Sequence, residues 1–163
     1  MPQEIKPLVR AAEIEAVPRP SFQHPYNENC EISGVRLSYL TGLERIGISL
    51  VTVPPGKDST CFHSHTCEEE WMYILSGKGL AHIGDEQHEV GPGDFMGFKT
   101  PSEGHMLHNN GQEDLVYLVG GENREVEIAD FPRLGKRMIR HGKHMDIYPH
   151  AAREEFPMKF EES

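Results

Sequence analysis

The sequence predicts an all-β fold, a sandwich or a barrel of short strands, and three observations support this prediction. Short runs rich in β-branched and aromatic residues follow one another from about residue 35 to residue 120. Clusters of Gly, Pro, Asn and Asp separate these runs, for example at 54–56 and 91–94. No helical stripe of useful length interrupts them, so a parallel sheet with crossover helices is not expected.

The expected strands are short and end at those turns. They span residues 35–40, 45–53, 70–76, 79–83, 87–90, 94–98, 105–109 and 115–120. A chain of 163 residues is long enough for one domain with its own core. We therefore expect three parts: an N-terminal arm over 1–34, a barrel over 35–121, and a C-terminal extension over 122–163 that packs on the barrel or on a dimer partner.

Two segments outside the strand-rich region carry local signals of their own. Residues 8–17 are compatible with a brief helix that Pro18 and Pro20 end, because proline removes a backbone donor and clashes with the preceding turn. Near the other end of the chain, 126–131 and 138–148 each supply a strand or a turn. These segments are expected to add to the barrel, with no linker that would require a second domain.

Charge and composition restrict the partners of this chain. It carries 16 basic and 26 acidic residues, a formal net charge of −10. Such a surface repels phosphate backbones and anionic lipids, so neither nucleic acid nor a membrane is an expected partner. Three cysteines without paired spacing fit a reducing compartment, and the N-terminal residues lack the apolar stretch of a secretory signal. We therefore expect a soluble, cytoplasmic protein.

The most informative residues are two histidines and a glutamate between the turn at 54–56 and the strand at 70–76. His63 and His65 are two positions apart, so in a strand their side chains point to the same face. Glu70 follows five positions later. Neutral imidazoles and a carboxylate suit zinc, iron, manganese or nickel. The segment therefore predicts a metal site.

The same segment resembles the first conserved motif of the cupins. That motif contains His-x-His, three or four residues, a glutamate, six residues and a glycine, and the chain has His63-x-His65-x4-Glu70-x6-Gly77. The count of six residues to Gly77 selects Glu70 over the two glutamates before it. The run from Glu70 through Tyr73 to Gly77 also matches the tail that is typical of cupins.

A second cupin motif is expected after a short spacer, and it is only partly matched. His105-x3-Asn109 fits its end, whereas seven residues separate Gly93 from Pro101 where the motif has five. Strand alternation places His105 and Asn109 on one face and His108 on the other. This alternation favours His105 as the third histidine, and a bulge would be needed for His108 to serve as well.

The resemblance implies a double-stranded β-helix, the jelly-roll barrel of the cupins, over residues 35–121. It also implies that His63, His65, Glu70 and His105 hold one divalent transition metal ion, which is Zn, Mn, Fe or Ni, with positions left open for a ligand. The implied function is a metal-dependent protein that acts on a small polar metabolite, of the sugar-phosphate isomerase or epimerase type. The alternatives are an iron-dependent dioxygenase and a non-enzymatic binding or sensing module. A homodimer is expected, because symmetric dimers are the commonest assemblies.

Several other residues have simpler interpretations. His82 and His88 are expected as exposed strand residues, and Cys61 as a small buried one. Trp71 should face away from Glu70. Core positions are expected at Tyr39, Met96, Phe98 and Tyr117. Four cationic side chains are candidates to meet a substrate phosphate: Arg36, Arg45, Lys57 and Lys99.

Overall fold

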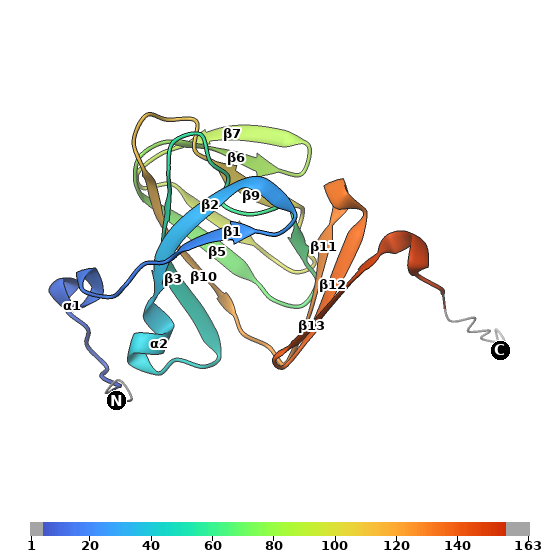
Figure 1. Ribbon diagram of the computed structural model, residues 1–163, viewed down its shortest axis with the longest axis horizontal. Coiled ribbons are helices and arrows are strands. Elements are labelled where there is room, and N and C mark those ends of the chain that lie inside the picture. The colour runs from blue at the N-terminus through green and yellow to red at the C-terminus, as the bar shows by residue number, and fades with distance from the viewer. Residues whose placement is uncertain (1–4, 156–163) are drawn as a thin grey trace.

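Antiparallel strands dominate the computed structural model, which describes residues 5–155 (Figure 1). The largest sheet has six strands in the order β1-β2-β3-β10-β5-β8. Their bounds are β1 Ser21–His24, β2 Asn27–Arg36, β3 Ile46–Val53, β10 Leu115–Glu122, β5 Glu70–Ser76 and β8 Phe95–Phe98. The prediction of an all-β fold is confirmed, and four of these six strands begin within one residue of the expected position.

A second sheet of three strands completes the barrel. Its order is β7-β6-β9, with β7 at Glu86–Val90, β6 at Gly79–Ile83 and β9 at His105–His108. Inward-facing side chains of both sheets form one apolar core: Val51, Val53, Met72, Ile74, Ala81, Val90, Met96, Phe98, Leu107, Leu115 and Tyr117. The two sheets therefore enclose a shared interior, as expected for a jelly roll.

The glycine that ends the first motif has a structural reason to be glycine. Gly77 follows β5 with a φ of 79°, which side-chain-bearing residues rarely adopt. A Cβ atom at this position would also overlap the backbone carbonyl oxygen of Asp114, just before β10. Gly77 therefore lets the chain turn tightly beside the neighbouring strand.

A third sheet joins the C-terminal segment to the metal-motif segment. Its order is β13-β12-β11-β4, with β13 at His144–Pro149, β12 at Lys136–His141, β11 at Val126–Phe131 and β4 at Ser64–His65. Ala129 pairs with His65, and Asp130 pairs with Ser64. Residues far apart in sequence are thereby brought to one place, and the orange and red strands stand beside the barrel in Figure 1.

The strand predicted over 35–40 is wrong from residue 37 onward. β2 ends at Arg36, and the next five residues form a short helix, α2 at Leu37–Thr41. Gly42 ends this helix in the left-handed conformation, at a φ of 73°. Ser38 and Leu40 are buried, and over so short a segment this alternation is the same in a helix as in a strand. Tyr39 is 68% exposed, so it does not belong to the core. The other three expected core residues, Met96, Phe98 and Tyr117, are buried.

The remaining helices are short. They are α1 at Ala11–Glu15 and two 3-10 turns at Pro132–Leu134 and His150–Ala152. Within residues 5–155, no helix is both long and apolar enough to cross a membrane. The division into arm, barrel and extension stays a prediction, and the outer ends of the arm and the extension, 1–4 and 156–163, lie outside the described residues.

Candidate metal centre

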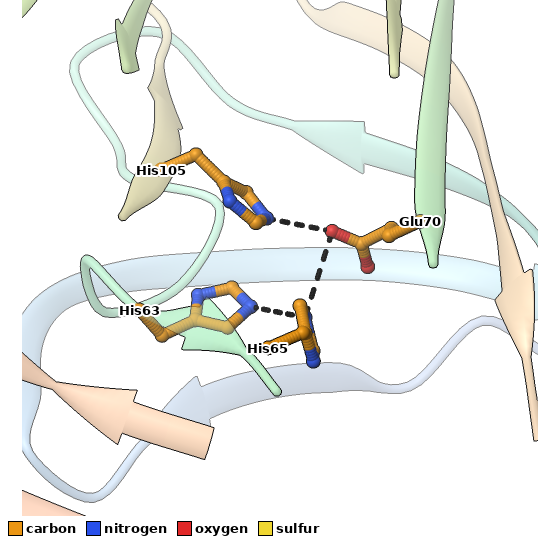
Figure 2. A group of neighbouring side chains, drawn as sticks. All are labelled: His63, His65, Glu70 and His105. Atoms are coloured by element: carbon orange, nitrogen blue, oxygen red, sulfur yellow. Dashed lines mark hydrogen bonds and ion pairs between the residues drawn. The ribbon is translucent and has the colours of Figure 1, made fainter. Parts of the chain in front are cut away.

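Four polar side chains converge where β4 and the residues just before it meet β5 and β9 (Figure 2). His65 lies in β4, Glu70 begins β5 and His105 begins β9. His63 comes just before β4 and forms a two-way backbone bridge with His105, with N···O distances of 2.8 and 3.2 Å. The sheets themselves therefore fix where these side chains start.

The atoms that could bind a metal converge. The Nε2 atoms of His63 and His65 are 3.1 Å apart. The Nε2 atom of His105 lies 2.8 Å from Oε2 of Glu70, and the Nε2 atom of His65 lies 3.8 Å from the same oxygen. One ligand atom from each of the four residues lies within 4.8 Å of all the others. The structure thus brings together all four residues that the sequence singles out.

Backbone carbonyl groups fix the tautomers of two of the imidazoles. Nδ1 of His63 lies 2.8 Å from the carbonyl oxygen of Cys61, and Nδ1 of His105 lies 3.0 Å from that of Glu103. A carbonyl oxygen only accepts hydrogen bonds, so each Nδ1 carries the hydrogen. In the neutral rings, the lone pairs of both Nε2 atoms therefore point into the cluster.

The electrostatics favour the protonation states that a metal requires. Burial, with the neighbouring His105 acting in the same direction, lowers the pKa of His63 to about 4. Burial alone would raise the pKa of Glu70, but the neighbouring His105 and the other two imidazoles favour the charged carboxylate and lower that pKa. At neutral pH, His63 is a neutral ring and Glu70 is a carboxylate.

Face alternation in β9 separates the two candidate histidines, as expected. The side chain of His105 is 1% exposed, and its ring stacks on Phe98 with 3.7 Å between centroids. His108 lies on the opposite face, where its Nδ1 is 2.7 Å from Oδ1 of Asp58. Among the described residues that could hold a metal, His105 belongs to the cluster and His108 does not.

The cysteines near the cluster have other partners. Cys61 is buried, its Sγ lies 3.1 Å from Nδ1 of His24, and burial raises the pKa of its thiol to about 11. It therefore stays a thiol at neutral pH. The backbone N–H of Cys67 donates to the carboxylate of Glu127 at 3.2 Å, and the thiol of Cys67 is not among the four converging groups.

Two of the four cationic side chains that were candidates to bind a substrate phosphate already contact other side chains. Nζ of Lys57 lies 3.3 Å from a carboxylate oxygen of Glu31, and the guanidinium of Arg36 lies over the ring of Tyr39. Trp71 faces outward, as expected from its position next to Glu70, and stacks against Phe95. No substrate-binding role follows from these contacts.

The sequence interpretation missed two carboxylates next to His65. Glu68 and Glu127 form a second group with this histidine, and Glu127 is 2% exposed. The signal was present in the expected strand at 126–131. Alternation places Glu127 on the same face as Ala129 and Phe131, so a charged residue occupies an otherwise apolar face.

Comparison with known proteins agrees with this geometry. The family model described as "Cupin domain" matches residues 49–121, which include all four residues of the cluster. A solved structure of a candidate sugar phosphate isomerase from Acidithiobacillus ferrooxidans is 33% identical, with a TM-score of 0.88. The match covers 93% of this chain and 97% of that one. The chain is a cupin.

More distant solved structures share the fold of this cupin. A sugar phosphate isomerase from Silicibacter pomeroyi is 22% identical, with a TM-score of 0.72, over 77% of this chain and 81% of that one. A predicted oxalate decarboxylase from Thermotoga maritima is 23% identical, with a TM-score of 0.58, over 72% of this chain and 99% of that one. Likenesses at this level show the fold alone.

A curated relative covers less of the cupin. An uncharacterised protein from Methanocaldococcus jannaschii is 38% identical over 66 residues, which are 40% of this chain. The aligned part spans 51% of the relative, so this chain matches about half the length of that protein.

Proposed function

We propose that this cupin is a metal-dependent enzyme of the sugar-phosphate isomerase type. His63, His65, Glu70 and His105 would hold one divalent ion. The observation that carries the proposal is the convergence of three imidazole Nε2 atoms and one carboxylate oxygen at a single point. The similarity to the Acidithiobacillus ferrooxidans protein over nearly the whole of both chains supports the substrate class.

The chemistry of these donors fits a divalent cation. The Nε2 atoms of His63 and His105 present lone pairs, because their Nδ1 atoms carry the hydrogens. Lone pairs that converge with a carboxylate repel one another unless a proton or a cation lies between them. Three nitrogens and one oxygen suit zinc, manganese, iron or nickel, and they leave open positions on a six-coordinate ion.

The residues of the chain would hold the ion and shield it. A divalent ion supplies Lewis acidity toward the carbonyl and hydroxyl oxygens of a sugar substrate. Phe98 covers one face of the His105 ring, and the ring of Phe131 lies 6.2 Å from that of His63. These aromatic rings limit the access of water to the His105 and His63 side of the cluster.

Turnover without oxygen tests this proposal. Protein loaded with zinc, manganese or ferrous iron would be incubated anaerobically with a panel of aldose and ketose phosphates, and interconversion would be followed by NMR. We expect metal-dependent interconversion that is lost in His65→Ala. Strict dependence on oxygen would contradict the proposal, as would tight binding of a sugar phosphate without turnover by fully metal-loaded protein.

A further inference from the structure

The side of His65 that faces away from the cluster is unusual for a buried imidazole. Its Nδ1 atom is inaccessible to solvent and forms no hydrogen bond with any residue in 5–155. The two other histidines of the cluster each direct Nδ1 at a backbone carbonyl oxygen. The group that faces Nδ1 of His65 is a carboxylate, since Oε1 of Glu127 lies 3.5 Å from this nitrogen.

Backbone contacts hold Glu127 in position. Its side chain is 2% exposed, and its oxygens accept hydrogen bonds from the N–H groups of Thr66 at 3.0 Å and Cys67 at 3.2 Å. Both N–H groups directly follow His65 in the chain, and β11 pairs with β4 beside them. The carboxylate is therefore fixed relative to the ring it faces.

We propose that Glu127 is the positioning residue for His65. The carboxylate accepts the Nδ1 hydrogen, which selects the tautomer whose Nε2 lone pair points into the cluster. The Nδ1–Oε1 distance needs to shorten by only about 0.3 Å to enter the usual range of an N–H···O bond. This inference rests on the proposed metal site. It assigns to the C-terminal segment, outside the matched cupin region, a direct role in preparing one ligand.

A second metal ion on this side of His65 is the alternative, and the contacts disfavour it. The carboxylate of Glu68 forms an ion pair with Arg140 and accepts the backbone N–H of Arg124 at 2.6 Å. An ion here would compete with the guanidinium and the backbone N–H on Oε1 of Glu68, and with the backbone N–H groups that donate to Glu127. The occupied carboxylates therefore fit a supporting role better than a second site.

Zinc affinity, measured by competition with a chromophoric chelator, tests the role of Glu127. Loss of a partner that orients a metal-binding histidine typically weakens metal binding about 10- to 100-fold. We expect Glu127→Gln to weaken zinc binding by about tenfold or more. Glutamine keeps an oxygen for the backbone N–H groups. A purely structural role of Glu127 therefore predicts a zinc affinity within about twofold of the wild type, which corresponds to less than about 0.5 kcal/mol of binding free energy.

Glu68→Gln is the matched control. It removes the same charge from the same group beside His65, but its carboxylate is bound to Arg140. We expect its zinc affinity to stay within about threefold of the wild type, because charge alone at a partly solvated position has a small effect. Equal losses in both variants would overturn the proposal in favour of a general charge effect.

A measurement on the wild-type protein covers the case in which Glu127→Gln fails to fold. In NMR spectra of zinc-loaded, 15N-labelled protein, we expect the Nδ1 hydrogen of His65 to exchange slowly with water and to show a nuclear Overhauser effect to the side chain of Glu127. Rapid exchange of that hydrogen would overturn the proposal.

If wild-type protein does not bind zinc, the metal site itself fails. If it binds zinc, loses it in His65→Ala, and keeps full affinity in Glu127→Gln, only the role of Glu127 is refuted.

Discussion

Two histidines in β9, His105 and His108, both contact a carboxylate, yet their surroundings differ. His108 and Asp58 form a closed pair, and the second oxygen of Asp58 accepts a hydrogen bond from the side chain of Asn27 at 3.0 Å. His105 meets Glu70 in the company of two further imidazoles whose Nε2 atoms point to the same place. In the pair, each oxygen of Asp58 has one donor, whereas the converging group has more acceptors than donors.

This difference teaches how to tell a structural histidine from a metal-binding one. Buried polar groups are normally matched one to one, and an unmatched group requires an explanation. At His108 the protein supplies one carboxylate partner for Nδ1, and the side chain is 29% exposed. At His105 the protein supplies only lone pairs and negative charge, which is the arrangement that a cation completes. Metal binding that depended equally on His105 and His108 would remove this contrast.

The largest effect is expected from removing a histidine of the metal-binding segment. His63→Ala and His65→Ala should each abolish stoichiometric metal in protein purified without added chelator, because each change removes one of four converging ligand atoms. Elemental analysis of both variants measures this directly. Exposed His88→Ala serves as the control and should keep its metal. Full metal content in both site variants would show that the ion binds elsewhere.

A pair of matched substitutions in β9 tests the contrast itself. His105→Ala should weaken metal binding by at least about 100-fold, and His108→Ala should change it by less than about threefold. The two changes remove the same side chain from the two ends of one four-residue strand, so chelator competition compares them directly. Similar losses in both variants would remove the basis for assigning His105 alone.

A smaller effect on stability is expected from the closed pair. Asp58→Asn keeps the shape but removes a charged acceptor from His108 and from Asn27. The free energy of unfolding should fall by about 1.5–3 kcal/mol, the usual range for a hydrogen bond to a charged group. Urea denaturation followed by circular dichroism measures it. Metal content should not change, and a loss of metal would place this pair inside the metal site.

The smallest effect concerns a surface pair in the C-terminal sheet. The hydrogen bonds from Arg137 hold the pKa of Asp130 below its usual value, against the opposing effect of burial. A lowered pKa in the folded state stabilises the protein above the pKa of the unfolded state, and this stabilisation is lost as the pH falls through the folded value. Asp130→Asn should therefore cost about 0.5–1 kcal/mol at pH 7, and the cost should shrink as the pH falls below the usual pKa of an aspartate. A cost that is independent of pH would contradict this.

Local sequence patterns predicted the barrel strands well because turns mark their ends. The strands expected at 70–76 and 79–83 have those bounds in the structure, separated by the turn that contains Gly77. The segment at Leu37–Thr41 was predicted wrongly, because five residues with alternating burial fit a helix turn as well as a strand. Pattern and length cannot decide between the two over so short a run.

The same reasoning explains which parts of the candidate site could be predicted. His63, His65 and Glu70 are close in sequence and share a recognisable spacing, and alternation in β9 favoured His105. Glu127 could not be assigned to the site, because its position depends on the pairing of β11 with β4. Sequence alternation shows that a residue faces inward, but it does not show which distant strand lies beside it.

The most direct test of the central claim is a crystal structure of the zinc-loaded protein with anomalous diffraction data collected at the zinc edge. We predict one anomalous peak per chain, about 2.0–2.2 Å from the Nε2 atoms of His63, His65 and His105 and from a carboxylate oxygen of Glu70. A peak bound to other residues, or no peak in crystals grown with excess zinc, would contradict the account.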